Sequence, residues 1–546
     1  MSFVSKIKIK AKSKRNIYDV VLSAIIGVAI VLSARIHFAG STGLGIEYNY
    51  IRKIGLIAIP QIFLISVICF MIIRIADYVC SHLRKEDCGS VKKMIQSSRK
   101  IWIWMILMTI FWSLYYLTYF PGGVPSDTQN SISYYFDHVK TNRFPFLYNE
   151  IIGAAISIGE YLDKDLTWQI GLLTAAQLIL LIAEFTYFNS WMIRYKVNDK
   201  LRICVMFFLT FFPIYPLYGV SVWKDTPFAM AFFLFMLFWI DILIQIINGS
   251  VKKKSIAKLI VGIFLVAFTR NNGIYAIIMF SFLFYLVTAT QKYSCKMVLN
   301  SSLLMAIIAI LIIQGPVYSK VLDSQAGTLE HLGIPIQQVA AVVVHNGKTK
   351  GDEWEDIGEF IPHDSIKEKF TPCCVDNLKW YSSINYTFFH SHTEEFIKLW
   401  IKLGLENPQI YFDEYLLQTC GFWDVSVKSD EGFLGCKVDK FSYWNQIEQT
   451  DFFEKIGAGS LKRILNWINP ISAAWLFWAF FVCGFYIMKR YGFRTILFVA
   501  PSLAVWVTLM IATPIAVSFR YLSSLMFALP LVLIVPEILK THFIDR

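Results

Sequence analysis

TPFAMAFFLFMLFWIDILIQII, residues 226–247, is the stretch that decides the fold class. It contains one ionisable side chain, Asp241, over a length that crosses the hydrocarbon core of a bilayer as an α-helix. Similar apolar blocks recur along the 546-residue chain, of which 56% is hydrophobic and only 16% charged. Soluble domains contain about 25% charged residues. The composition therefore excludes an ordinary soluble enzyme and predicts an all-α polytopic membrane protein.

The apolar blocks predict a helical bundle of about twelve membrane spans. The first block follows six basic residues, but it is longer than the apolar region of a cleavable signal peptide. We therefore expect it to remain as an anchor with its N-terminus inside. The twelve expected spans are 17–38, 54–74, 101–120, 166–190, 203–222, 226–247, 257–270, 273–290, 297–315, 469–488, 495–513 and 518–538.

The distribution of Lys and Arg predicts the orientation in the cell membrane. With the N-terminus in the cytoplasm, the inner segments carry 27 basic residues and the short outer segments carry 8. Both termini are then cytoplasmic, and the polar stretch 316–468 is expected to be a mainly helical extracytoplasmic domain. The stretch 146–162 is expected to be a helix on the outer face. The net charge of +12 therefore does not indicate nucleic-acid binding, because the basic residues lie mostly beside the spans.

The predicted organisation has four parts. No Cys-x-x-Cys spacing occurs, so the cysteines do not indicate an additional metal-binding domain. The disulfide pairing of Cys373, Cys374, Cys420 and Cys436 is left open. The four parts are a basic segment with two additional spans (1–100), a transmembrane core (101–315) with its first outer loop at 121–165, the extracytoplasmic domain (316–468) and three C-terminal spans (469–546).

Charged residues that end apolar spans are costly there and are therefore candidates for function. Asp127 follows a turn rich in Pro and Gly, where it either caps a new helix or accepts a proton from a hydroxyl group. Lys224 and Asp225 form a tight turn before the sixth span. They either pair with each other, or Lys224 binds a phosphate oxygen while Asp225 acts as a second acid.

Two arginines occupy comparable positions. Arg270 separates two spans, where its planar guanidinium either binds an anion or extends to the lipid headgroups. Arg520 begins the last span in the same manner. With Asp127, Lys224 and Asp225, the sequence thus predicts three cations and two carboxylates on the outer face.

Short motifs with polar and aromatic residues follow one another along the chain in this order: Ser-Asp-Thr (126–128), Arg-Phe-Pro-Phe-Leu (143–147), Trp-Lys-Asp (223–225), Arg-Asn-Asn-Gly (270–273), Gly-Ile-Pro-Ile-Gln-Gln (333–338) and Phe-Arg-Tyr (519–521). Their order resembles that of an uncharacterised family of multi-pass membrane proteins from Gram-positive bacteria. That family is in turn similar to the GT-C glycosyltransferases, which use sugars linked to polyprenyl phosphate. The resemblance covers the chain from about residue 100 to its end.

The resemblance implies a GT-C-like bundle whose transmembrane core is 101–315. In GT-C enzymes the first outer loop carries an acidic residue, and Asp127 occupies that position here. The usual His-Pro-Pro of the interfacial helix reads Arg143-Phe144-Pro145 in this chain. Because these three residues differ from the usual motif, we assign no role to them.

We therefore expect a membrane glycosyltransferase that moves a sugar, with inversion, from a polyprenyl-phosphate-linked donor to a cell-envelope glycan or lipid acceptor on the outer face. Besides donor and acceptor, membrane lipids are the expected partners; no cofactor is predicted, and a need for a divalent metal is left open. The predicted site comprises Asp127 and Asp225 as catalytic residues, Lys224, Arg270 and Arg520 as phosphate-binding residues, and Asn271, Tyr521, Gln337 and Gln338 as substrate-binding residues. For the two glutamines, packing inside a helical domain is an equal alternative.

Three other functions fit parts of the pattern. A transporter or a flippase of lipid-linked oligosaccharides also has many spans, although such proteins commonly contain repeated halves, and no repeat is evident here. A receptor could use the domain 316–468 for binding, but it would not need acids and bases at one depth. A glycan polymerase or ligase is a neighbouring enzyme class.

Overall fold

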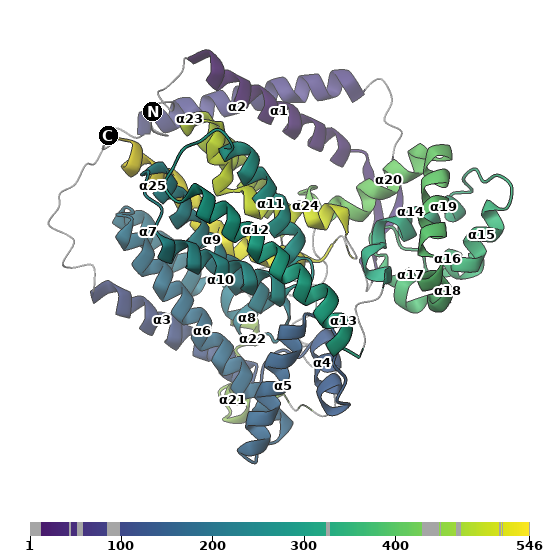
Figure 1. The fold of residues 1–546 in the computed structure, drawn as a ribbon, viewed down its shortest axis with the longest axis horizontal. Helices are drawn as coiled ribbons and strands as arrows, with labels where there is room; N and C mark the ends of the chain where they lie inside the picture. Colours follow the sequence, from purple (N-terminus) through teal and green to yellow (C-terminus); the bar gives the residue numbers. More distant parts are fainter. Residues whose placement is uncertain are drawn as a thin grey trace.

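The computed structural model describes residues 12–42, 45–51, 58–83, 99–323, 328–427, 447, 449–465, 471–512, 515 and 517–544. Helices make up most of this part of the chain, as expected (Figure 1). The all-α prediction needs one correction, because strands β1 (Ile36–Thr42) and β2 (Gly45–Ile51) pair as an antiparallel hairpin. The basic N-terminal residues 1–11 lie outside the described residues.

Helix α9 (Asp225–Ile247) is the most enclosed helix of the transmembrane bundle, together with α25 (Ser523–Ile544). Its side chains are apolar on all sides, which is typical of a helix surrounded by protein. Helix α10 (Lys253–Thr269) and α25 pack along it. The Trp239 Nε1–H donates a hydrogen bond of 2.8 Å to the Leu497 carbonyl oxygen, and so connects α9 to the 3₁₀ helix η6 (Phe493–Phe498).

Seven helices of the described chain are long and apolar enough to cross a membrane. The chain is therefore a multi-pass membrane protein, while the count of about twelve spans stays a prediction. The expected span 203–222 is divided into α7 (Asp199–Phe211) and α8 (Ile214–Gly219), because Pro213 lacks an amide donor and disfavours a helical Phe212. The seven stretches are Asn16–Ser33, Ala58–Asp77, Ile101–Thr118, Leu166–Arg194, Asp225–Ile247, Lys296–Val321 and Phe519–Thr541.

Helices α1 (Lys12–Ser33) and α2 (Ala58–Leu83) pack against each other at one edge of the bundle, beside α23 (Ala474–Tyr491) (Figure 1). Buried charges join them to the bundle: Lys489 Nζ lies 2.7 Å from Asp19 Oδ1 and also contacts Asp77. This arrangement fits the prediction that the first two apolar segments are additions to a core.

The remaining helices of the bundle surround α9 or lead toward its N-terminal end. Beyond α12 the chain makes a π-helical turn, η2 (Ile313–Val317), which contains Pro316. These helices are α3 (Arg99–Thr118), α4 (Ser126–Phe136), α5 (Phe146–Tyr161), α6 (Leu166–Arg194), α11 (Gly273–Thr288), α12 (Lys296–Ile312), α13 (Tyr318–Val321), α24 (Ala500–Ile511) and the 3₁₀ helix η7 (Phe519–Leu522).

Residues 328–427, which we call the cap domain, form a separate group of helices to one side of the bundle (Figure 1). They enclose their own core, in which Ile336, Leu378 and Phe396 are buried. The domain comprises η3 (Thr328–His331), α14 (Gly333–Val344), α15 (Glu353–Phe360), α16 (His363–Lys369), α17 (Asp376–Tyr381), α18 (Tyr386–Ser391), α19 (Thr393–Glu406), α20 (Pro408–Thr419) and η4 (Cys420–Phe422).

The C-terminal boundary predicted for this domain is too late. Residues 449–465, which include α21 (Phe452–Lys455) and α22 (Lys462–Leu465), return to the bundle. The Thr450 amide donates to the Phe120 carbonyl oxygen at 2.8 Å, and the Tyr115 hydroxyl donates to the Leu465 carbonyl oxygen at 3.1 Å. Polar composition alone did not separate this returning segment from the cap domain.

The cysteines give a partial answer on pairing. Within the described residues, Cys373, Cys374 and Cys420 are buried and form no disulfide, whereas Cys436 lies outside these residues.

Candidate active site

Asp127 lies in the first turn of α4, directly after a turn that begins at Pro121. The N-cap residue of α4 is Pro125, and no side chain makes a capping hydrogen bond there. The interpretation of Asp127 as an N-cap is therefore wrong. Its carboxylate is left to interact with residues from other parts of the chain.

The turn before α4 is joined backbone to backbone with the segment before α9. The Gly123 amide donates to the Val220 carbonyl oxygen, and the Val222 amide donates to the Gly123 carbonyl oxygen, both at 2.8 Å. Gly122 has a φ of +127°, and a Cβ atom there would lie 2.8 Å from the Val220 oxygen. Glycine thus permits an approach that brings Asp127 close to Lys224.

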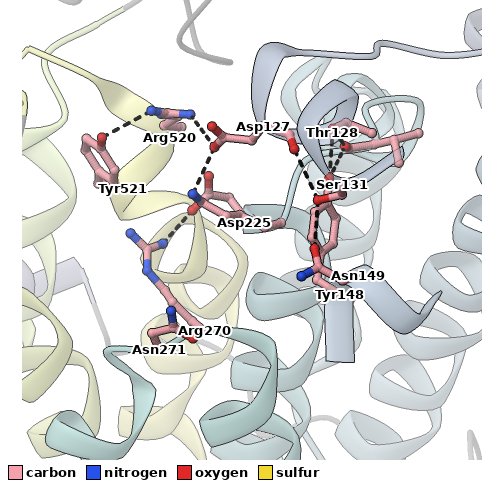
Figure 2. Close-up of polar contacts among 12 residues, drawn as sticks. Asp127, Thr128, Ser131, Tyr148, Asn149, Asp225, Arg270, Asn271, Arg520 and Tyr521 are labelled. Atoms are coloured by element: carbon pink, nitrogen blue, oxygen red, sulfur yellow. Dashed lines mark hydrogen bonds and ion pairs between the residues drawn. The ribbon is translucent and has the colours of Figure 1, made fainter. Parts of the chain in front are cut away.

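A second network fixes α4 and α5 against the same segment (Figure 2). The hydroxyls of Thr128 and Tyr148 lie 2.8 Å apart, and both contact the Val222 carbonyl oxygen; with one proton each, one hydroxyl donates to the carbonyl and the other donates to it or to its neighbour. The Ser131 hydroxyl donates to Asn149 Oδ1 at 2.8 Å. These buried contacts hold the start of α4, and with it Asp127, in a fixed position.

The five predicted charged residues meet at this place, and we call them the charge cluster: Asp127, Lys224, Asp225, Arg270 and Arg520. Asp127 Oδ2 lies 2.9 Å from Lys224 Nζ and 3.5 Å from Arg520 Nη1. Arg270 Nη1 lies 2.5 Å from Asp225 Oδ1. Figure 2 shows Asp127 between Arg520 and the Asp225–Arg270 pair.

These pairs decide between the interpretations that the sequence left open. Lys224 pairs with Asp127 and Asp225 pairs with Arg270, so the self-paired Lys224–Asp225 turn is wrong. Extension of Arg270 to the lipid headgroups is also wrong, because its guanidinium is largely buried against a carboxylate. The prediction that acids and bases gather at one face of the bundle is confirmed.

Several buried donors of the charge cluster lack a hydrogen-bond partner within the described residues. They are Arg520 Nε and Nη1 and, beside them, the indole Nε1 of Trp223, over whose ring the Arg520 guanidinium lies at 4.2 Å. The 3.5 Å separation from Asp127 gives Arg520 Nη1 an ionic contact without a good hydrogen bond. Buried donors without partners are costly, so these groups favour binding of a ligand that supplies acceptor oxygens.

The charges of the site also set the protonation of Asp127. Burial opposes ionisation of its carboxyl group, but Lys224 and Arg520 outweigh this effect and hold the pKa of Asp127 below its ordinary value. Arg143 contributes in the same direction. Asp127 is therefore ionised at neutral pH. With three cations and two carboxylates, the charge cluster retains one excess positive charge.

Two of the predicted substrate-binding residues adjoin the charge cluster. The Tyr521 hydroxyl accepts a hydrogen bond of 3.1 Å from Arg520 Nη2, and its ring lies 5.6 Å from the Arg270 guanidinium carbon. Asn271 Nδ2 donates at 2.9 Å to the carbonyl oxygen of Asn142, which lies between α4 and α5. Asn271 thus connects the turn of Arg270 to the loop that leads into α5.

The assignment of Gln337 and Gln338 as substrate-binding residues needs correction. Both are buried in the cap domain and connect its helices. Gln337 Nε2 donates to Glu414 Oε1 at 3.0 Å, and Gln338 Nε2 donates to the Tyr411 carbonyl oxygen at 2.9 Å. Because their amides hold α14 to α20, the alternative of packing inside a helical domain is confirmed.

Sequence reasoning missed Asp376 and left Arg143 without a role. The electrostatic influence of Arg520 and Asp127 reaches Asp376 at the start of α17, where burial raises the pKa of its carboxyl group. The Arg143 guanidinium lies 4.8 Å above the ring of Trp380. No local motif marks Asp376, because only the fold places the cap domain beside the charge cluster.

Among the described residues, no group of three His, Cys, Asp or Glu side chains is arranged to hold a metal ion.

The sequence model of a family of unknown function, DUF6020, matches residues 138–540. The chain belongs to this family. The match includes Lys224, Asp225, Arg270 and Arg520, whereas Asp127 and helices α1–α4 precede it. No curated protein and no solved structure matches the chain.

Proposed function

We propose that this protein is a glycosyltransferase that moves a sugar from a polyprenyl-phosphate carrier to an acceptor hydroxyl. The observation that carries the proposal is the charge cluster, in which an ionised carboxylate faces the buried Arg520 guanidinium, whose Nε and Nη1 have no hydrogen-bond partner among the described residues. The GT-C resemblance of the sequence motifs supports the same class of reaction. We further propose that the bundle has about twelve spans and that the charge cluster faces the outer side of the cell membrane.

The cations support an anionic substrate. In the part of the chain that the structure describes, Arg520 Nε and Nη1 have no hydrogen-bond partner, and Lys224 is a second cation at Asp127. A guanidinium matches the geometry of phosphate oxygens, and the excess positive charge of the cluster favours an anion. A phosphate group bound here gains hydrogen bonds that the protein alone leaves unmade.

An apolar groove supports a lipid carrier. A cavity of about 450 Å³ lies between α5, α10 and the chain around η2, and includes Phe146, Phe268 and Tyr318 in its lining. Phe268 is two residues from Arg270, and Phe146 is two residues from Phe144, whose ring lies 4.4 Å from Lys224 Nζ. The groove and the cations are thus neighbours along the chain, and in our proposal the groove holds an isoprenoid chain attached to the bound phosphate.

The proposed reaction is a single displacement. An acceptor hydroxyl oxygen bonds to the anomeric carbon while the bond between that carbon and the phosphate oxygen breaks, which inverts the configuration. Polyprenyl phosphate leaves with the bonding electrons, and Lys224 and Arg520 stabilise its negative charge. The acceptor proton passes to Asp127.

Substrate binding also prepares Asp127 for this role. In the ligand-free arrangement its carboxylate pairs with Lys224 and Arg520, which makes it a weak base. A phosphate competes for the same two cations, and their withdrawal raises the proton affinity of Asp127. Asp225 keeps its separate partner, Arg270, and so acts mainly by positioning that guanidinium.

The test uses membranes that contain the protein and a polyprenyl-phosphate hexose with an isotope-labelled sugar. We expect the protein to transfer label to envelope material, and the Arg520→Gln variant to be about 10²–10³-fold slower, as for loss of an electrostatic stabiliser. Lys398→Gln, an exposed cation of the cap domain, is the matched control and leaves the rate unchanged. Equal rates for Arg520→Gln and the unmodified protein, at equal amounts in the membrane, contradict the proposal.

A further inference from the structure

Three aromatic side chains of the cap domain form one exposed surface, which we call the aromatic face: Trp380, Tyr381 and Tyr386. Their exposed fractions are 37%, 65% and 46%. The rings of Trp380 and Tyr386 are stacked, with centroids 6.3 Å apart and an interplanar angle of 22°. An exposed group of large aromatic side chains on a polar domain indicates a binding surface.

The aromatic face adjoins the charge cluster through Arg143 and Asp376. The Arg143 guanidinium covers one side of the Trp380 ring at 4.8 Å, and its charge also acts on Asp127. Asp376 precedes Trp380 by one helical turn and so projects from the same side of α17. Its carboxylate lies within electrostatic reach of Arg520 and Asp127. Helix α17 thus leads from the charge cluster to the aromatic face.

The chemistry of this surface favours a carbohydrate. Flat aromatic rings pack against the C–H faces of pyranose rings, while neighbouring polar groups bind sugar hydroxyls. Ser383 and Asn385 are exposed between Tyr381 and Tyr386 and provide such groups. The adjacent cation Lys379 is buried 4.0 Å from Glu330, so it adds little positive charge to the surface.

We propose that the aromatic face binds the sugar rings of a glycan acceptor and presents one of its hydroxyls to Asp127. This proposal rests on the proposed function and narrows its acceptor from a glycan or lipid to a glycan. The exposed part of the Trp380 ring and the exposed side of Tyr386 contact the sugar rings, and Asp376 holds the hydroxyl-bearing end near the charge cluster.

The cap domain offers a matched control. Trp354 in α15 has an exposed fraction of 36%, almost the same as that of Trp380. It stacks on His363 at 3.9 Å and has no contact with Arg143 among those the structure describes. Substitution of Trp354 removes an equally exposed indole from the same domain but not from the aromatic face.

The experiment measures glycan binding without the donor. Oligosaccharides released from the envelope of the source cell are labelled with a fluorophore and passed over the full-length protein in lipid nanodiscs. We expect retention by the unmodified protein and by Trp354→Ala, and at least tenfold less by Trp380→Ala and Tyr386→Ala. Thermal unfolding of each variant checks that it is folded.

The proposal is overturned if the unmodified protein retains no oligosaccharide or if Trp380→Ala retains as much as the unmodified protein. Retention of the lipid fraction of the envelope in place of oligosaccharides also overturns it and favours a lipid acceptor. Because this measurement needs no sugar transfer, it separates failure of the acceptor site from failure of the proposed function. Glycan binding that depends on Trp380, without any transfer from a polyprenyl-phosphate sugar, supports the site and contradicts the reaction.

Discussion

Asp127 meets two opposing requirements in the proposed reaction. It must be ionised to accept a proton, and Lys224 and Arg520 ensure this by lowering its pKa. The same cations also weaken it as a base until a phosphate draws them away. The residue therefore couples donor binding to activation of the acceptor.

This coupling predicts a change in the pH dependence of transfer. At limiting donor, the rate of the proposed reaction reports the donor-free protein, in which the pKa of Asp127 is lowered, so its acid limb lies below the ordinary carboxyl pKa of about 3.9. Lys224→Ala removes one of the cations, so the pKa of Asp127 rises and the acid limb moves to higher pH. Lys224→Arg keeps the charge and leaves the limb in place. Rates normalised to each variant's maximum test this, and an unmoved limb in Lys224→Ala contradicts it.

The lowered pKa of Asp127 also makes the stability of the fold depend on pH. A carboxylate with a lowered pKa in the folded state stabilises the fold above its unfolded pKa, and this stabilisation is lost as the pH falls through the folded pKa. Lys224→Ala should therefore reduce stability at neutral pH and flatten its acid dependence. Unfolding in detergent between pH 3 and pH 7 measures both effects.

At the residue scale, the sequence predicted the members of the charge cluster but not which of their side chains pair with each other. Asp127, Lys224, Asp225, Arg270 and Arg520 were identifiable because charges at the ends of apolar spans are costly. The pairing of these side chains could not be identified from the sequence. Asp127 and Arg520 lie almost four hundred residues apart, and only the packing of α4, α9 and α25 brings them together.

At the scale of elements, the short helices α4 and α5 explain how a membrane bundle presents polar chemistry. They leave the bundle after α3 and are fixed by hydrogen bonds of Thr128 and Tyr148 to the segment before α9. One end of α5 reaches the charge cluster, while Phe146 and Leu147 line the apolar groove. In the proposed reaction, the same helix therefore contacts both the polar and the apolar half of the donor.

The groove yields a prediction on lipid length. Leu265→Trp places a bulky side chain in the groove, so KM for a long-chain polyprenyl donor should rise at least tenfold. A donor with a short isoprenoid chain should be affected little, because it contacts less of the groove. Leu286→Trp, on the exposed surface of α11, is the control and changes neither value. Equal effects of Leu265→Trp on both donors would show that the groove does not hold the chain.

Element boundaries were predicted unevenly. The apolar period identified α9 and α25, which are the most buried of the seven long apolar helices. It failed at 203–222, where Pro213 divides the helix, and at 449–465, where polar residues return to the bundle. In both places local chain stereochemistry or tertiary contact outweighed hydropathy.

At the scale of the whole molecule, the charge cluster lies where the bundle and the cap domain meet. The cap domain contributes Asp376 and the aromatic face, and the bundle contributes the charges and the apolar groove. Helices α1 and α2 precede the part that the family model matches and attach through the buried Lys489–Asp19 pair. The matched part thus includes four residues of the charge cluster and the cap domain, whereas Asp127 precedes it.

The orientation of this assembly is testable by labelling. If the cap domain is extracytoplasmic, a cysteine placed at Lys398 in α19 reacts with a membrane-impermeant maleimide in intact cells. A cysteine at Lys200, in the turn expected to be cytoplasmic, reacts only after permeabilisation. The chain without added cysteines gives the background from the native thiols. The reverse pattern contradicts the orientation and places the charge cluster on the cytoplasmic side.

The central claim is that Asp127 accepts the proton during sugar transfer, and one comparison tests it most directly. The full-length protein in lipid nanodiscs is given a polyprenyl-phosphate sugar and envelope oligosaccharides, beside Asp127→Asn and the matched variant Asp165→Asn, which alters the N-cap of α6. We predict that Asp127→Asn lowers the transfer rate by about 10²–10⁴-fold while Asp165→Asn keeps it. Transfer by a folded Asp127→Asn protein at the unmodified rate would contradict the account.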